Sequence, residues 1–240
     1  MTPERLETIK ATLARRQLDL TVVMENVRKP HNLAAVGRTL EAVGGLQIHA
    51  ITQLTSLRLS QMAASGIRRW LKLVKHPTTE QGIQHLKQQG LQIVATSLCK
   101  TSKDFREADY TRPTAILVGE ELEGISEQAI AMADEHVTIP MMGFVQSLNV
   151  SVASALVLYE AYRQRSVAGM YDERRLDDDI YQALLFEACH PKVAEYCRQK
   201  KLPYPVMDEN GKIVEPIADS QTYTDDTFAD WIKRNESVQS

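Results

Sequence analysis

Strand and helix patterns alternate along most of this 240-residue chain, and this alternation limits the possible folds more than any other feature. Short runs rich in Val, Ile and Leu are separated by longer stretches with helical periodicity. Strands that are apolar on both faces are typical of parallel sheets covered by helices on both sides. The sequence therefore predicts an α/β fold with a mostly parallel sheet. The expected strands are 20–24, 46–52, 71–75, 91–98, 114–118 and 137–140, and the expected helices are 3–17, 33–43, 78–89, 126–134 and 150–163, with a small-residue helix or turn at 60–67.

Composition excludes several classes of protein. A hydrophobic fraction of 43% and a charged fraction of 25% are typical of soluble globular proteins. No apolar run reaches the roughly 18 residues of a membrane span, and the N-terminus lacks the apolar core of a signal peptide. The cysteines Cys99, Cys189 and Cys197 form no C-x-x-C pair, and the six histidines have no metal-ligand spacing. We therefore expect a cytoplasmic protein without a metal site or disulfides.

The net charge of −3 is unevenly distributed. Residues 1–40 carry seven Lys/Arg and four Asp/Glu, and residues 41–170 carry twelve of each. Residues 171–240 carry nine basic and fifteen acidic groups. The excess negative charge therefore belongs to the C-terminal part, and the N-terminal part remains compatible with binding to phosphate.

The position of a ligand site follows from the predicted sheet. Ligands of parallel α/β sheets bind beyond the carboxyl ends of the strands. Three loops fall at such ends, 26–32, 119–124 and 141–149, and we expect them to meet at one site. Neither a G-x-G-x-x-G fingerprint nor a Walker motif is present, so an ordinary dinucleotide or P-loop site is not indicated.

The segment 137–162 has an unusual start to its long helix. Pro140 ends a short strand, and Gly143 lies in the following loop. Ser147 and Asn149 then precede a helix that is apolar on nearly all sides, which predicts a buried helix. Ser-x-Asn before a helix commonly serves as a cap. The alternative is that the helix N-terminus and these polar groups bind an electron-rich ligand.

Arg38 lies in the middle of the largely apolar helix 33–43. Burial of an unpartnered guanidinium is costly. Arg38 can pair with Glu41 at the i,i+3 spacing on the surface, or it can face a pocket that receives an anion. The helix alone does not distinguish these two arrangements.

The composition changes towards both ends of the chain. We expect an N-terminal helical extension at 1–18, a central domain at 19–166 and a C-terminal helical extension at 167–240. Helices are expected at 177–188, 192–201 and 224–234, with a turn at 208–212.

Three segments together resemble the SPOUT family of RNA 2′-O-methyltransferases. They are NVRKPHNLAAVGRT (26–39), LVGEELEG (117–124) and IPMMGFVQSLNVSVASAL (139–156), in the family's order and spacing. The resemblance implies an α/β trefoil-knot fold that binds S-adenosylmethionine, and a homodimer whose active site uses both chains. The flanking segments look like the branch of the family that methylates guanosine-18 in the D-loop of tRNA.

The resemblance also implies roles for individual residues. The catalytic set would be Arg38, Asn32, Glu121, Ser147 and Asn149. The cofactor would lie among Thr96, Gly119, Ile139 and Leu148. RNA contacts would come from Arg28, Lys29, His31, Arg15 and Arg16, with Lys200 and Lys201 extending that surface.

The role of Arg38 has two readings. The family's counterpart is assigned as the general base, which requires a transiently neutral guanidinium although its pKa is above 12. Alternatively, Arg38 stays cationic, stabilises the developing alkoxide and holds a phosphate, and this reading is physically simpler.

Three other functions remain open from the sequence. The same chemistry on a ribosomal RNA ribose or on another tRNA ribose is the nearest. A catalytically silent RNA-binding dimer is disfavoured by the complete motifs. An unrelated nucleotide-binding α/β protein is disfavoured by the missing glycine fingerprint.

Overall fold

The computed structural model describes residues 1–26, 29–53, 70–120 and 124–214. The strands are β1 (Leu20–Glu25), β2 (Gln47–Ile51), β3 (Lys72–His76), β4 (Gln92–Thr96), β5 (Lys103–Asp104), β6 (Thr114–Val118) and β7 (Glu135–Thr138). The helices are α1 (Pro3–Ala14), α2 (Pro30–Ala42), α3 (Thr79–Gln88), α4 (Glu127–Met132), α5 (Val150–Val167), α6 (Asp178–Cys189) and α7 (Pro191–Lys200), with a 3-10 turn, η3, at Phe105–Glu107. The segments predicted at 60–67 and 224–234 lie outside the described residues.

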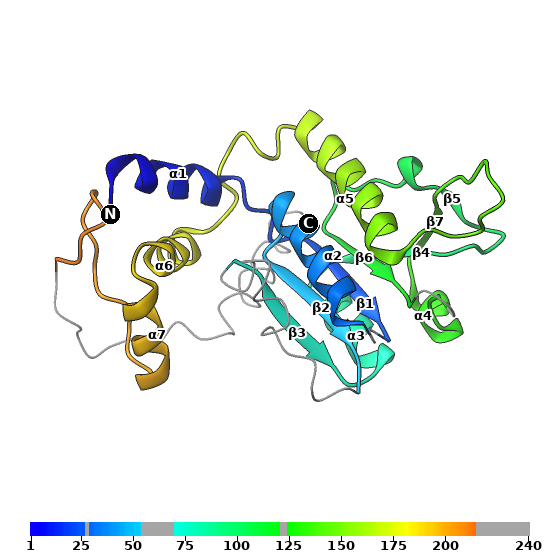
Figure 1. The fold of residues 1–240 in the computed structure, drawn as a ribbon, viewed down its shortest axis with the longest axis horizontal. Coiled ribbons are helices and arrows are strands. Elements are labelled where there is room, and N and C mark those ends of the chain that lie inside the picture. Colours follow the sequence, from blue (N-terminus) through cyan, green and yellow to red (C-terminus); the bar gives the residue numbers. More distant parts are fainter. Residues whose placement is uncertain (27–28, 54–69, 121–123, 215–240) are drawn as a thin grey trace. The chain divides into compact units, whose positions relative to one another are not determined.

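The seven strands form one sheet in the order β3-β2-β1-β6-β4-β7-β5 (Figure 1). Every pair of neighbouring strands is parallel. The prediction of a mostly parallel α/β sheet is therefore confirmed. The central strands β1 and β6 are buried along their whole length, as expected for a sheet covered on both faces.

Helices cover both faces of this sheet. One apolar core combines residues of α2 and α5 with the strands, including Leu33, Val36 and Leu158. A second core combines α3 and α4 with the other face, including Ile83 and Ala129. The alternation of side chains along each strand divides the sheet's apolar residues between these two cores.

Three helices differ from the prediction by three residues or more. Helix α1 ends at Ala14 rather than at residue 17. Helix α2 begins at Pro30 rather than at residue 33, because proline's fixed φ suits the first turn of a helix and its missing N–H costs nothing there. Helix α5 runs on to Val167, and the expectation that it is buried on all sides is wrong. One side of it exposes Val152, Leu156 and Tyr159, although these are large apolar side chains.

The C-terminal half of α5 is held by buried polar contacts. Arg165 is fully buried, and its Nη1 lies 2.6 Å from Asp19 Oδ1 and 3.0 Å from Gln17 Oε1. Its remaining N–H groups donate to the carbonyl oxygens of Asp19, Tyr110 and Arg112. This guanidinium joins α5 to the start of β1 and to the segment before β6.

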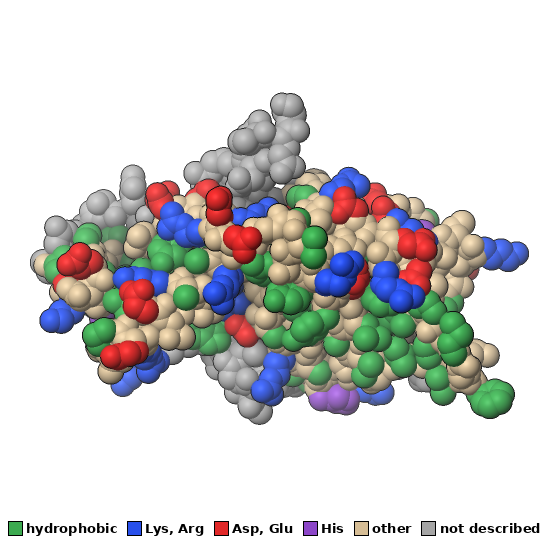
Figure 2. Space-filling view, turned by 90° about the horizontal axis from the view of Figure 1, so that it is seen from above, with side chains coloured by type: hydrophobic (Ala, Val, Ile, Leu, Met, Phe, Trp, Pro, Cys, Tyr) green, Lys and Arg blue, Asp and Glu red, His purple; other side chains and the backbone are tan. Residues whose placement is uncertain are grey.

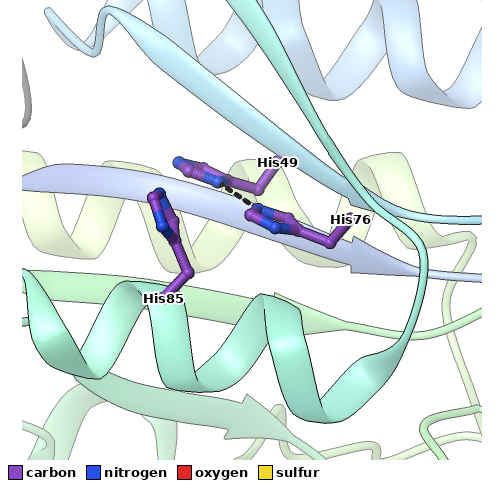
Figure 3. Close-up of side chains that lie close together, drawn as sticks. All are labelled: His49, His76 and His85. Carbon is purple, nitrogen blue, oxygen red and sulfur yellow. Dashed lines mark hydrogen bonds between the residues drawn. The ribbon is translucent and has the colours of Figure 1, made fainter. Parts of the chain in front are cut away.

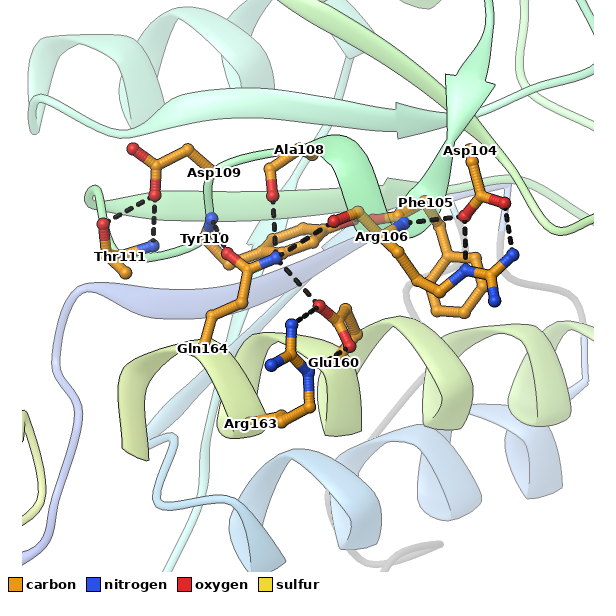
Figure 4. Close-up of polar contacts among 10 residues, drawn as sticks. All are labelled: Asp104, Phe105, Arg106, Ala108, Asp109, Tyr110, Thr111, Glu160, Arg163 and Gln164. Carbon is orange, nitrogen blue, oxygen red and sulfur yellow. Dashed lines mark hydrogen bonds and ion pairs between the residues drawn. The ribbon is translucent and has the colours of Figure 1, made fainter. Parts of the chain in front are cut away.

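Gln164 makes a second connection from α5 to the segment between β5 and β6 (Figure 4). Its Oε1 accepts a hydrogen bond from Tyr110 N at 3.0 Å, and its Nε2 donates to Ala108 O at 2.9 Å. Glu160, one turn earlier, accepts from the same amide and forms a bidentate pair with Arg163. The segment 103–111 is therefore fixed by side chains of α5, not by its own short elements.

The chain forms two compact units, one of residues 17–170 and one of residues 1–16 with 171–240. The second unit contains α1, α6 and α7 around a small core with Leu6, Leu13 and Leu185. The predicted turn at 208–212 is confirmed: Asp208 and Lys212 are joined through their backbones, and Gly211 has a φ of +72°. Among the described residues, no helix is long and apolar enough to cross a bilayer.

Candidate functional site

The sheet order brings the three sequence motifs to one edge. Strands β1, β6, β4 and β7 are consecutive neighbours and run parallel, so their carboxyl ends lie together. The motif segments follow β1, β6 and β7 directly. The described parts of loops 26–32, 119–124 and 141–149 therefore begin at one edge of the sheet, as predicted.

Asn32 and Arg38 both lie on α2, but in different environments. Asn32 is buried in the first turn, whereas Arg38, six residues later, is exposed. No ion pair or hydrogen bond joins the Arg38 guanidinium to another residue of the described ranges. The i,i+3 pair with Glu41 is thus not formed, and Arg38 is available to an anion.

The loop after β6 is closed by its own backbone. Glu120 N donates to Gly124 O at 3.2 Å, and Gly124 N donates to Glu120 O at 3.0 Å. A Cβ at Gly119 would lie 2.0 Å from the carbonyl carbon and oxygen of Gly124, so no larger residue fits there. Gly124 has a φ of +70°, which glycine adopts without strain. Glu121 lies outside the described residues.

Glu25, which we did not predict as a site residue, forms hydrogen bonds with the residue that follows this loop closely, Ser126. It is buried at the end of β1, and its carboxylate accepts 2.7 Å hydrogen bonds from Ser126 N and Ser126 Oγ. Thr79 Oγ1 at the start of α3 also donates to it. Since a buried carboxylate needs such partners, Glu25 fixes the exit of the 119–124 loop against β1 and α3. The sequence signal that could have revealed Glu25 is a carboxylate at the end of an otherwise apolar strand.

Asn149 caps α5. Its Oδ1 accepts a hydrogen bond from Ser151 N at 2.9 Å and one from Ser151 Oγ. The capping interpretation is therefore confirmed for Asn149. Ser147 is exposed and Leu148 is half-buried, so both remain accessible just before the helix.

The residues predicted to hold a cofactor lie at the ends of three adjacent strands. Thr96 ends β4, Gly119 follows β6 and Ile139 follows β7. Thr96 Oγ1 donates to Leu117 O at 3.2 Å, which fixes its side chain between β4 and β6. All three residues are partly exposed, and Ile139 packs on the core beneath α2 and α5. Their backbone groups can therefore contact a ligand at this edge.

The residues predicted to contact RNA differ in their exposure to solvent. Lys29 and His31 are exposed at the start of α2, and Arg15 is exposed at the end of α1. Arg16 is buried, so the expectation that it lies on a basic surface is not met. Residue type did not indicate this burial, because the neighbouring Arg15 is exposed and only the packing of the chain distinguishes the two. Arg28 lies outside the described residues.

Comparison with known proteins agrees with this geometry. Residues 19–159 match the model of the SpoU rRNA Methylase family, and residues 163–216 match the model of the SpoU rRNA methylase C-terminal region. The tRNA (guanosine(18)-2′-O)-methyltransferase of Escherichia coli K12 is 50% identical over 215 residues, which cover 89% of this chain and 94% of the relative.

Solved structures are similar as well. The crystal structure of the A. aeolicus TrmH/SpoU tRNA modifying enzyme has a TM-score of 0.71 and 39% identity, and it covers 79% of this chain and 97% of that one. The AdoMet-bound rRNA methyltransferase from Sinorhizobium meliloti has a TM-score of 0.55 and 28% identity, covering 64% and 59%. The chain belongs to the SpoU rRNA methylase family.

Proposed function

We propose that this protein transfers a methyl group from S-adenosylmethionine to the 2′-hydroxyl of a tRNA ribose, namely that of guanosine-18. The observation that carries this proposal is the 50% identity to an enzyme of that name over 94% of its length. The geometry supports it, because the three motif segments lie at the carboxyl ends of neighbouring parallel strands.

Backbone groups near Thr96, Gly119, Ile139 and Leu148 would hold the cofactor. The tight loop at Gly119 fits this role, since Gly119 has no side chain and its backbone packs directly against that of Gly124 beside the proposed site. When bound, S-adenosylmethionine supplies an electrophilic methyl group on a positively charged sulfur. The protein then has to position the ribose and stabilise the charge that develops on its oxygen.

Arg38 would supply that stabilisation as a cation. Its guanidinium is exposed and makes no contact with the described residues that would neutralise it. Asn32, buried one turn and a half earlier on α2, would orient the ribose or Arg38. Glu121 would hold this network, and Ser147 and Asn149 would complete the site at the start of α5.

A homodimer would complete this site. A helix rises about 1.5 Å per residue, so Arg38 lies about 12 Å along α2 from Pro30, away from the strand ends of its own chain. Large apolar side chains are also exposed: Met142, Phe144, Val145, Val152, Leu156 and Tyr159. Figure 2 shows hydrophobic side chains gathered in the part of the view that α5 occupies. Such an exposed group is typical of an interface between proteins, and a second copy would bring Arg38 to its partner's cofactor site.

Basic residues would contact the RNA. Arg15, Arg28, Lys29 and His31 would contact tRNA phosphates, which contribute affinity and position but not base choice. The extensions 1–18 and 167–240 would flank the catalytic domain 19–166. The protein would act in the cytoplasm, and the trefoil knot implied by the family resemblance stays a prediction.

Methyl transfer to defined RNA tests the proposal. Purified protein with labelled S-adenosylmethionine should methylate a tRNA transcript, and mapping should place the label on the ribose of guanosine-18. A transcript with guanosine-18 replaced by another nucleotide is the matched control and should take up no label. Label found only in ribosomal RNA would select the nearest alternative. Tight tRNA binding without any transfer would select the silent dimer.

Oligomeric state provides a separate test. Substitution Leu156→Glu places a charge on the exposed side of α5 and should raise the dimer dissociation constant by about 30-fold or more, as expected for a central apolar contact. Analytical ultracentrifugation measures this. A monomeric parent protein that is fully active would contradict the shared active site.

A further inference from the structure

Three histidines meet on the side of the sheet that faces α3 (Figure 3). His49 comes from the middle of β2, His76 ends β3, and His85 lies on α3. One ring nitrogen of each lies within 4.8 Å of the other two. His49 Nδ1 and His76 Nε2 are only 2.9 Å apart, and their rings are stacked with an interplanar angle of 6°. The three imidazoles therefore lie close enough together to bind one ligand, and His49 and His76 are joined by a hydrogen bond.

The surroundings of this cluster are mostly apolar. His49 and His76 are 1% and 6% exposed, and His85 is partly exposed. Ile51 and Ile83 of the nearby core belong to the same strand and helix as His49 and His85. A group of three polar rings in such a place is costly unless the rings satisfy one another or bind something together.

The protonation of the two buried histidines suits metal binding. Burial lowers the pKa of His49 well below its usual value, and the charges of His76, His85 and Lys72 lower it further. Burial and His85 lower the pKa of His76 to about 4. Both imidazoles are therefore neutral at pH 7, and a neutral imidazole has a free lone pair for a metal ion.

We propose that His49, His76 and His85 form a binding site for a divalent transition-metal ion of the zinc class. Three imidazole ligands with water at a fourth position are a common set for Zn²⁺. Tetrahedral coordination with Zn–N bonds of about 2.0–2.1 Å places the ligand nitrogens about 3.4 Å apart. For both rings to bind the ion, the hydrogen bond between His49 Nδ1 and His76 Nε2 has to break, and its proton moves to the other nitrogen of the donor ring. The 2.9 Å pair then opens slightly and the third ring moves inwards. The three donors of this group are imidazole nitrogens, which suit zinc-class ions, whereas Mg²⁺ and Ca²⁺ prefer oxygen ligands.

Gln89 is placed to support the third ligand. Its buried side-chain amide lies 3.1 Å from His85 Nε2. A metal-bound imidazole usually donates its other ring N–H to an acceptor, and the amide oxygen of Gln89 can accept that bond when the amide is turned by 180°. This arrangement requires that His85 bind the ion through Nδ1.

The ion would have a structural role. It would connect β2, β3 and α3 on one face of the sheet, whereas α2 and α5, which carry Arg38 and Asn149, cover the other face. The site departs from our expectation, drawn from residue spacing, that the chain binds no metal. Spacing did not indicate it because the three ligands come from three separate elements.

Metal binding to the full-length protein tests this proposal. After treatment with a chelator and dialysis, the protein should bind one Zn²⁺ per chain in a calorimetric titration and unfold at a higher temperature with Zn²⁺ than without it. Co²⁺ in place of Zn²⁺ should give the visible absorption of a four-coordinate ion. His85→Gln, at a partly exposed position, should fold normally and reduce the affinity by about 100-fold. Gln89→Leu should reduce it by about 10-fold.

His136→Gln is the matched control, since His136 lies on β7 and belongs to no such group in the described ranges. It should leave Zn²⁺ binding unchanged. Circular dichroism of each metal-free variant confirms that it is folded. The proposal is overturned if the parent protein shows no saturable binding, or if folded His85→Gln binds Zn²⁺ as tightly as the parent. His49→Gln, if folded, must show the same loss as His85→Gln.

Discussion

At its C-terminal end, α5 is fixed by buried polar contacts to other segments, whereas at its N-terminal end the polar groups bond only within the cap and the preceding loop is exposed. Arg165 has a hydrogen-bond acceptor for each of its three nitrogens. At the other end, Ser147 is exposed, and Phe144 in the preceding loop is fully exposed. The comparison shows that one helix can be fixed to the scaffold at one end and still present accessible groups at the other.

The same difference separates two arginines on neighbouring helices. Helices α2 and α5 pack against each other, yet Arg165 is buried and paired while Arg38 is exposed. A buried guanidinium requires full pairing and then holds the structure, whereas an unpaired one has to stay in contact with solvent until a ligand arrives. This separation of roles can be tested by substitution.

The largest effect is expected for Arg165→Met. The change leaves the largely buried carboxylate of Asp19 without its partner, and removal of one member of a buried pair typically costs about 3–5 kcal/mol of unfolding free energy. Urea unfolding followed by circular dichroism measures it. Arg163→Met is the matched control, because the side chain of Arg163 is 61% exposed and its pair with Glu160 contributes about 1 kcal/mol or less. Equal losses in the two variants would contradict the distinction.

In contrast to Arg165→Met, Arg38→Ala should reduce activity strongly and leave stability almost unchanged. Methyl transfer should fall by about 100- to 1000-fold, as for removal of one group that stabilises a developing oxyanion. The free energy of unfolding should change by about 0.5 kcal/mol or less, because Arg38 is exposed. Single-turnover kinetics and urea unfolding measure the two quantities.

Arg38→Lys refines this prediction. It keeps the positive charge and loses the planar fork of the guanidinium, so it should retain part of the activity. Turnover close to that of the parent would exclude any role that depends on the fork.

A smaller effect is expected at the start of α5. Asn149→Ala removes the cap and should cost about 1 kcal/mol, whereas Asn149→Ser keeps a good capping residue and should restore most of that stability. The methyltransfer rate of Asn149→Ser then separates the two roles of Asn149. A rate equal to the parent's would show that Asn149 acts only as a cap, and a low rate in a stable protein would show that its amide contacts the reactants.

The smallest expected effect is on the pH dependence of the unfolding free energy, to which Glu160 contributes. Hydrogen bonds, first from Arg163 and then from Gln164, hold the pKa of Glu160 below its usual value. The stability that this carboxylate contributes is therefore present above the unfolded-state pKa of about 4.3 and is lost as the pH falls through the lower folded-state pKa. Glu160→Gln should cost about 1 kcal/mol or less at pH 7 and should flatten the decline of stability below pH 4.3. An unchanged slope in urea unfolding at pH 5, 4 and 3 would contradict this.

Most of the fold was predictable because its signals are local. The strands at 20–24 and 114–118 match β1 and β6 almost residue for residue, since runs of buried apolar residues bounded by polar turns leave few alternatives. The start of α2 was misplaced by three residues, because Pro30 can end a loop or begin a helix with the same local sequence. The exposed side of α5 was missed for another reason: hydrophobicity does not distinguish the interior of one chain from a surface that another molecule covers.

The sequence by itself determined the parallel α/β class, the positions of the three motifs and the candidates Arg38, Ser147 and Asn149. These follow from residue type and from spacing along the chain. Only the tertiary structure decided that Glu25 holds the loop beyond β6, that Arg165 is buried with Asp19, and that His49, His76 and His85 meet. The contacts of Glu25 with Ser126, of Arg165 with Asp19 and of His49 with His76 join residues 101, 146 and 27 positions apart. The physical reason is that such contacts depend on which strands become neighbours, and strand order is set by packing of the whole sheet and not by local preference.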